Sequence, residues 1–170
     1  MKIGFIGFGE AAYNLALGLH GEGLSELYAY DTAINDTAIG RQLYSRAQTA
    51  QVTIGSQVAE LAEHADVLFS AVPSSYTIEA CQSILPYLHS KQLYADVSAS
   101  TPQVKQTIGA LLKGISISFA DAAMMGSLPQ NKHRVPILAS GQGAEMFCRQ
   151  MAPYGMNITV VSEIPGDASA

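Results

Sequence analysis

The chain has 170 residues, of which 48% are hydrophobic and 14% are charged, and its formal net charge is −5. This length and apolar content predict one soluble globular domain with its own core, and no uninterrupted apolar segment is long enough to span a membrane. The acidic balance excludes the electrostatic footprint of proteins that bind nucleic acids or anionic membrane surfaces. The first residues lack the pattern of a secretory signal, so we expect a cytoplasmic location.

The first predicted element is a buried parallel strand over the apolar run Ile3–Ile6. A G-x-G-x-x-A pattern follows directly. In this pattern the first glycine makes a tight turn, the second lets the backbone approach a pyrophosphate, and the small last residue lets a helix pack against the strand. An amphipathic helix from about Glu10 to His20 comes next, and its free N–H groups would face the phosphates. We predict that a dinucleotide binds at Gly7, Phe8, Gly9, Glu10, Ala11 and Ala12.

The second predicted strand, Leu27–Tyr30, ends at Asp31, the spacing at which this fingerprint places an acid for the adenosine ribose. Its carboxylate would accept both ribose hydroxyls of NAD and repel the 2′-phosphate of NADP. We therefore predict NAD as the cofactor, although Arg41 or Arg46 would reverse this choice by folding back onto a 2′-phosphate. The plainer alternative is an ordinary glycine turn and a strand-end aspartate, but strand, turn, helix and acid occur here together.

Short strands and helices alternate through the rest of the chain. The strands are predicted over residues 52–54, 66–72, 93–97, 115–120, 135–139 and 158–161, and the helices over 57–64, from 74 or 75 toward 88, from 101–102 onward, and over 143–151. This alternation predicts a Rossmann-type α/β fold, with a doubly wound, mainly parallel sheet in a three-layer α/β/α arrangement. We place the dinucleotide-binding domain at residues 1–162 and the start of a linker at residues 163–170.

Ligands of open parallel sheets bind beyond the carboxyl ends of the strands, so the loops there are the candidate functional segments. Val72, Pro73 and Ser74 follow the fourth strand and are predicted to border the nicotinamide ribose of the cofactor. Ser98 lies in the hydroxyl-rich segment after the fifth strand, which would hold a substrate carboxylate. The Gly126-Ser127 pair after the sixth strand offers backbone amides to an anion.

Three motifs together resemble one known family. The opening G-F-I-G-F-G, the D-V-S-x-S-x-P segment at residues 96–102 and the D-A-A-M-M-G-S segment at residues 121–127 are similar to the β-hydroxyacid dehydrogenases. That group includes 6-phosphogluconate and 3-hydroxyisobutyrate dehydrogenases, and the resemblance is greatest to a phosphogluconate dehydrogenase-like NAD-binding branch. It covers essentially the whole chain. It implies hydride transfer between NAD(P) and a small 3-hydroxy acid, with Ser98 and Gly126 contacting the substrate.

The third motif departs from the family pattern, which is commonly D-A-P-V-S-G-G. This chain has Ala123 for the proline, Met125 for the serine and Ser127 for the last glycine. Loss of the serine hydroxyl predicts a larger or less polar substrate, which Ser98, Met125, Gly126 and Ser127 would contact. Imine-reducing enzymes share the same cofactor domain, so imine reduction is an alternative reaction.

The family's general acid/base is a lysine in a G-x-x-x-x-x-K pattern on a helix that leads to an all-helical second domain. Gly166 begins such a pattern, and the lysine would lie just after Ala170. The resemblance therefore implies that the chain is the cofactor domain of a longer enzyme that forms a homodimer. We expect no catalytic residue in the chain itself and little or no turnover by it.

A stand-alone module that binds or senses a dinucleotide without catalysis is the second hypothesis, and the substrate-loop residues Ser98 and Gly126 favour the enzyme. No metal site is predicted, because Cys81 and Cys148 lack the spacing of metal ligands. The basic cluster Lys132-His133-Arg134 is either a solvated loop or a contact for a substrate anion.

Overall fold

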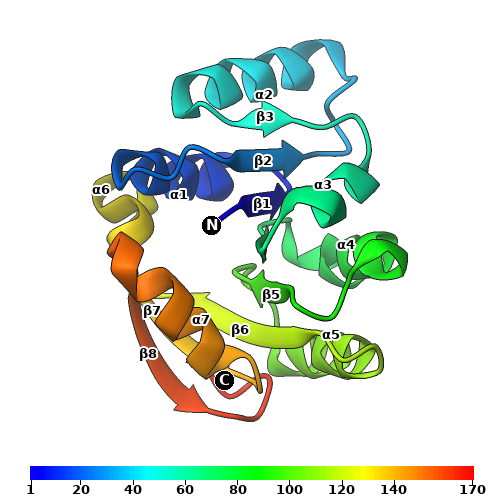
Figure 1. Cartoon of the computed structure of the whole chain (residues 1–170), viewed down its shortest axis with the longest axis vertical. Helices are drawn as coiled ribbons and strands as arrows, with labels where there is room; N and C mark the ends of the chain where they lie inside the picture. Colours follow the sequence, from blue (N-terminus) through cyan, green and yellow to red (C-terminus); the bar gives the residue numbers. More distant parts are fainter.

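One eight-stranded sheet organises the chain, in the order β3-β2-β1-β4-β5-β6-β7-β8, in a computed structural model that describes residues 1–170 (Figure 1). The strands are β1 Ile3–Ile6, β2 Leu27–Tyr30, β3 Thr53–Ile54, β4 Val67–Ser70, β5 Leu93–Asp96, β6 Ser118–Met124, β7 Pro136–Ser140 and β8 Asn157–Ser162. Every neighbouring pair is parallel except β6 and β7. The predicted Rossmann-type, mainly parallel sheet is confirmed.

Helices cover both faces of the sheet (Figure 1). They are α1 Glu10–Gly21, α2 Thr37–Ala50, α3 Val58–His64, α4 Thr77–Ile84, α5 Pro102–Lys113, α6 Leu128–Asn131 and α7 Ala144–Met151, with 3-10 turns η1 Ser74–Tyr76, η2 Leu85–Tyr87, η3 Lys132–Arg134 and η4 Ala152–Tyr154. Helices α1, α2 and α7 pack into one hydrophobic core. Helices α3, α4 and α5 pack into a second core on the other face.

Aromatic rings fill the first core around the central strands. Phe5 of β1 and Phe69 of β4 stack with centroids 5.5 Å apart, and Phe147 of α7 packs edge-on against Phe69 at 5.7 Å. All three side chains are fully buried. Burial of each ring contributes about 2–3 kcal/mol, so these contacts hold the central strands β1 and β4 against α7.

The structure differs from the sequence-based elements at α2 and at β6–β7. Helix α2 was not predicted, because it buries only a narrow stripe at Gly40, Leu43, Ala47 and Ala50. Its start is capped by Asp36, whose carboxylate accepts from the N–H groups of Ala38 and Ile39. Strand β6 runs on to Met124, and the antiparallel β7 pairs with this extension.

The segment after β8 folds back against the sheet. Residues 163–170 form turns rather than a helix. The N–H of Ala168 donates to Oγ of Ser140 at 3.0 Å, and Oγ of Ser169 donates to Oδ1 of Asp121 at 2.7 Å. This segment is therefore hydrogen-bonded to strands β6 and β7. Separately, none of the helices combines the length and apolarity that crossing a bilayer requires.

Candidate functional site

The glycine-rich turn joins the end of β1 to the start of α1. Gly7 has φ +82°, and a Cβ there would lie 2.7 Å from the carbonyl oxygen of Ala71 and 2.9 Å from Cγ1 of Val72. Only glycine combines this φ with this space. The turn therefore packs directly against the end of β4.

Gly9 differs from Gly7, because its φ of −78° suits any residue and a Cβ there would meet no atom within 4 Å. Gly9 caps α1, and no side chain bonds to the helix N-terminus. The first N–H groups of the helix have no intrahelical partner and face this open space. The arrangement is a cradle for an anion, and a side chain at Gly9 would fill it.

Asp31 ties the end of β2 to the glycine-rich turn. Its Oδ2 accepts from the N–H of Phe8 at 2.9 Å, and its Oδ1 accepts from the N–H of Ala33 at 2.9 Å. A carboxylate has about four acceptor positions, so both oxygens keep capacity for hydroxyl donors. The carboxylate is half-buried beside the cradle, where an adenosine ribose would reach it.

The loop after β4 lies beside the same turn. Val72 is half-buried, whereas Pro73 and Ser74 are exposed. Tyr76 of η1 leaves 57% of its surface exposed. The loop thus presents an apolar surface at the edge of the sheet.

Three hydroxyls form a triangle beyond β4 and β5. Oγ of Ser98 lies 2.9 Å from Oγ of Ser100, and Oγ1 of Thr77 lies 3.3 Å from the first and 3.0 Å from the second. Thr77 also donates to the carbonyl oxygen of Ser74 at 2.9 Å. Because the proton of Thr77 is used there, only the two serine protons serve the three sides of the triangle. The triangle can rearrange to give one proton to a ligand oxygen.

Exposure within the triangle is unequal. Thr77 is fully buried and Ser98 is 7% exposed, whereas Ser100 is half-buried. Ser100 is therefore more accessible to a ligand than Ser98. The structure thus adds Ser100 to the predicted Ser98 as a candidate contact.

A buried charge cluster underlies the triangle. Nζ of Lys105 lies 3.2 Å from Oδ1 of Asp121 and 3.6 Å from Oδ2 of Asp96, and none of the three side chains is exposed. Burial raises the pKa of Asp96 above its ordinary value of 3.8, and the Lys105 ammonium opposes this rise. Oδ2 of Asp96 has no hydrogen-bond partner.

The third sequence motif, residues 121–127, begins within β6 and ends directly before α6. Met125 leaves 57% of its surface exposed, while its N–H donates to the carbonyl oxygen of Pro136 at 2.7 Å. Gly126 and Ser127 are exposed, and their amides make no hydrogen bond within the chain. The predicted anion contact at these two amides stays a prediction, and Met125 lies beside them as an apolar neighbour.

The basic cluster of η3 packs against the far end of α1. Nε2 of His133 lies 2.9 Å from Oε1 of Glu22, and Arg134 bonds to the same oxygen. The hydrogen bond from His133 lowers the pKa of Glu22, with Arg134 adding to the effect. Glu22 follows the 12 residues of α1, about 18 Å along the helix from the glycine-rich turn. The cluster packs against the last turn of α1, away from the glycine-rich turn. This position favours neither of the two predicted alternatives, a solvated loop or a contact for a substrate anion.

Comparisons with known proteins identify the family of the chain. A family model described as NADP oxidoreductase, coenzyme F420-dependent, matches residues 2–100. The chain belongs to this family. The matched residues of the NADP oxidoreductase family include the glycine-rich turn, Asp31, the loop after β4 and the hydroxyl triangle.

Two solved structures resemble the chain at 30% identity or more. A conserved hypothetical protein from Sinorhizobium meliloti 1021 is 35% identical with a TM-score of 0.92, over 99% of this chain and 56% of that one. A conserved protein of unknown function, described as structurally similar to 3-hydroxyacid dehydrogenases, is 30% identical with a TM-score of 0.82, over 99% and 60%. The predicted relationship to the NAD-binding domain of these dehydrogenases is confirmed.

Solved structures of lower sequence identity share the fold alone. They include a 3-hydroxyisobutyrate dehydrogenase from Mycobacterium tuberculosis, 17% identical with a TM-score of 0.83 over 99% of this chain and 56% of that one. An imine reductase variant from Myxococcus stipitatus is 16% identical with a TM-score of 0.80 over 99% and 57%. An uncharacterized 28.5 kDa protein of Methanothermus fervidus is 27% identical over 99% of this chain and 61% of its own length. The chain thus spans somewhat more than half of the length of its relatives.

Sequence reasoning did not single out Thr77 or Lys105 of this candidate site, and it included Ser100 only as part of the hydroxyl-rich segment at residues 96–102. Lys105 had a readable signal, because it shares the apolar face of α5 with Ile108 and Leu112. A lysine on such a face needs a buried partner. Thr77 had no such signal, since only the pairing of β4 with β5 brings its loop next to Ser98 and Ser100.

Proposed function

We propose that the chain binds NAD along the carboxyl edge of its sheet and serves as the cofactor domain of a dehydrogenase or reductase of the β-hydroxyacid dehydrogenase type. The observation that carries this proposal is the hydrogen bond from Phe8 to Asp31 beside the open face of Gly9. It puts a carboxylate for ribose hydroxyls next to free amides for a pyrophosphate. These are the two contacts by which a Rossmann-type domain distinguishes a dinucleotide from a simple anion.

The residues present fit such a cofactor. The backbone of Gly7–Ala12 would hold the pyrophosphate, Asp31 the adenosine ribose, and Val72, Pro73 and Ser74 the nicotinamide ribose. A Cβ at Gly9 would meet no protein atom within 4 Å, so the space in front of this residue is open to a ligand. The chemistry that a bound nicotinamide supplies is acceptance or donation of a hydride.

The substrate would lie over the hydroxyl triangle and the loop after β6. Ser98 and Ser100 would orient an oxygen of the substrate, and the amides of Gly126 and Ser127 would bind an anionic group. Met125 and Tyr76 each expose 57% of their surface at this edge. We therefore favour a substrate that is larger or less polar than a short 3-hydroxy acid.

Oxidation of a hydroxyl group also requires a base to take its proton. Residues 71–76, 97–101 and 125–127 contain no Lys, His, Asp or Glu, and Lys105 is fully buried beneath them. As the family resemblance implies, we propose that a longer protein carries the base as a lysine on a helix that leads to a second, all-helical domain, and that this second domain mediates homodimer formation. The chain alone should bind the cofactor and turn over little substrate.

Two alternatives rest on particular observations. The lack of an exposed charged side chain in these three loops suits an uncharged substrate, and this favours imine reduction as the second candidate reaction. The lack of a base at the same edge suits a dinucleotide-binding module without catalysis. A mixture of the chain, NAD⁺ and a panel of 3-hydroxy acids should show no formation of NADH. Robust turnover by the chain alone would contradict the placement of the base.

Cofactor preference gives the sharpest test of the site. We expect titration calorimetry to show at least tenfold tighter binding of NAD⁺ than of NADP⁺, because Asp31 repels a 2′-phosphate. Asp31→Asn keeps the shape and one backbone bond but removes the charge, so it should narrow this preference. Asp167→Asn is the matched control, since Asp167 is exposed and its side chain makes no hydrogen bond.

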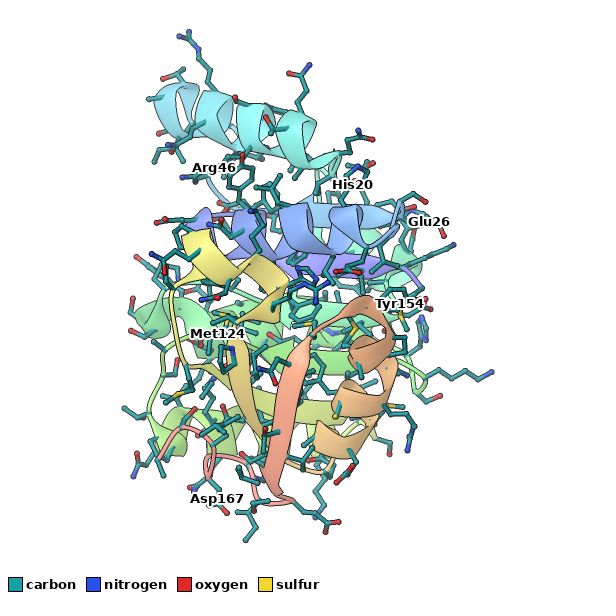
Figure 2. The ribbon with its side chains drawn as sticks, turned by 90° about the vertical axis from the view of Figure 1, so that its left-hand side faces the viewer. His20, Glu26, Arg46, Met124, Tyr154 and Asp167 are labelled. Carbon is teal, nitrogen blue, oxygen red and sulfur yellow. The ribbon has the colours of Figure 1, made fainter.

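Equal affinity of the native chain for both dinucleotides would contradict the role of Asp31. Arg41 and Arg46 of α2 are the residues that would then hold a 2′-phosphate. Arg46 instead lies over the ring of Tyr13 on α1, 5.8 Å from its centroid, and Figure 2 shows it in the space between α2 and α1. This contact supports the preference for NAD.

A further inference from the structure

Lys105 makes an unusually complete set of buried contacts. Its Nζ donates to the carbonyl oxygens of Asp96 and Ser98, each at 2.9 Å, and lies 3.2 Å from Oδ1 of Asp121. An ammonium has three N–H donors, so all are used by these three oxygens. The side chain is fully buried. Lys105 therefore has no donor left for a ligand and no path to one.

The two carbonyl groups that Lys105 contacts lie in the turn that carries Ser98 and Ser100, two of the three residues of the hydroxyl triangle. The carbonyl oxygen of Ser98 also accepts from the N–H of Ser100 at 3.0 Å, and the N–H of Ser98 donates to Oδ1 of Asp96 at 2.9 Å. The buried ammonium of Lys105 thus holds the turn from Asp96 to Ser100 in place, and we call this set of contacts the clamp. The directions of the two serine hydroxyls follow from this turn.

The clamp continues toward the segment after β8 through Asp121. Oδ2 of Asp121 accepts from Oγ of Ser140 at 3.3 Å, and its Oδ1 accepts from Oγ of Ser169 at 2.7 Å. Figure 1 shows the C-terminus lying beside β6, the strand that carries Asp121. A continuous set of polar contacts therefore runs from Ser169 through Asp121 and Lys105 to Ser98.

We propose that Lys105 is a positioning residue that sets the geometry of the Ser98–Ser100–Thr77 triangle and links it to the segment at residues 166–170. The proposal rests on the proposed function in one respect, namely that the triangle contacts the substrate. It does not depend on the identity of the substrate, because the clamp consists of contacts within the chain. A shift of residues 166–170 would reach the triangle through the same contacts.

The test must separate loss of the clamp from loss of the fold. Lys105→Met alone would leave the carboxylates of Asp96 and Asp121 buried without a cation, and this can unfold the chain. Asp121→Asn removes one of these charges and keeps groups that can bond to Ser140 and Ser169. The informative comparison is therefore Lys105→Met/Asp121→Asn against Asp121→Asn. Lys113→Met, at an exposed lysine on the same helix, is the control for removal of a lysine.

Amide hydrogen exchange measured by NMR reads out the clamp directly. We expect the N–H groups of Ser98 and Ser100 to exchange at least tenfold faster in the double variant than in Asp121→Asn. Exchange in β1 should change less than twofold, and so should the affinity for NAD⁺. Unchanged exchange at Ser98 and Ser100, or faster exchange throughout the sheet, would overturn the positioning role.

Binding of 3-hydroxy-4-phenylbutyrate, a 3-hydroxy acid with a large apolar group, in the presence of NAD⁺ supplies the functional readout. If the triangle contacts this probe, the double variant should weaken its binding at least fivefold while NAD⁺ affinity is retained. If exchange increases at the two serines but the probe binds to the native chain without shifting their resonances, Lys105 still positions the turn. In that case the proposed substrate role of the triangle fails instead.

Discussion

Replacement of Gly9 by alanine should abolish dinucleotide binding without harming the fold. The φ of −78° at Gly9 suits alanine, and the new Cβ would meet no protein atom within 4 Å. Alanine is a poorer helix cap than glycine, but it lowers the entropy of the unfolded chain. These effects oppose each other and leave the free energy of unfolding within about 1 kcal/mol of the native value.

The loss of binding can be estimated from the same geometry. The methyl group would occupy the space in which the pyrophosphate approaches the amides of α1. Displacement of the phosphates from two charged hydrogen bonds, at about 1.5–3 kcal/mol each, removes roughly 3–6 kcal/mol of binding free energy. That range corresponds to a weakening of about 100-fold or more.

Gly7→Ala is the matched comparison, because it should destabilise the fold, whereas Gly9→Ala should weaken only the binding of the dinucleotide. At Gly7 the φ of +82° and the carbonyl oxygen of Ala71, 2.7 Å from the new Cβ, both oppose a side chain. Left-handed backbone strain alone costs about 1–2 kcal/mol, so this variant should unfold at a clearly lower temperature.

The assay combines thermal unfolding of both variants with calorimetric titration of NAD⁺ into Gly9→Ala. We expect native stability and no measurable binding for Gly9→Ala. Native affinity in a folded Gly9→Ala variant would refute the assignment of the cradle to the pyrophosphate. A strongly destabilised Gly9→Ala variant would instead refute the reasoning about open space at this position.

Three further predictions follow from the buried and paired groups. The raised pKa of Asp96 means that the folded chain binds a proton at this carboxylate more tightly than the unfolded chain does. The free energy of unfolding should therefore fall as pH rises above 3.8. Unfolding measurements on Asp96→Asn over the same pH range should not show this fall. The lowered pKa of Glu22 has the opposite sign, so Glu22→Gln should lower the melting temperature at neutral pH, and the difference should vanish as pH falls below 4.5. Burial raises the pKa of Cys81 to about 12, so iodoacetamide at pH 8 should label Cys148 well before Cys81, and equal labelling would contradict the burial.

The start of the chain was the most predictable part of the fold. Strand β1, the glycine-rich turn and α1 lie within a residue or two of their predicted limits, because the turn requires glycine at Gly7 and the apolar periodicity of α1 is regular. Helix α2 was missed, yet its Asp36 cap and the spacing of Leu43 and Ala47 indicate it in retrospect. The reversed direction of β7 leaves no mark in local sequence, because strand direction depends on the path of the connecting segment.

In the candidate site too, some residues were predictable from local sequence and others depend on how the chain folds. Residues of the glycine-rich turn are contiguous, so a motif describes them, and Asp31 occurs at a fixed interval from that motif. The triangle combines Thr77 with Ser98 and Ser100, which lie more than 20 residues away and meet only through the β4–β5 register. The buried Lys105 depends on two carboxylates from separate strands, and pairing of this kind is a tertiary property.

An NMR titration of the isotope-labelled chain with NADH tests the central claim most directly. The account predicts that the largest amide shifts occur at Phe8–Ala12 and Asp31–Ala33, with further shifts at Val72–Ser75 and at the triangle where the nicotinamide end arrives. Shifts confined to other surfaces, or no saturable shifts at millimolar NADH, would contradict the assignment of this edge as a dinucleotide site.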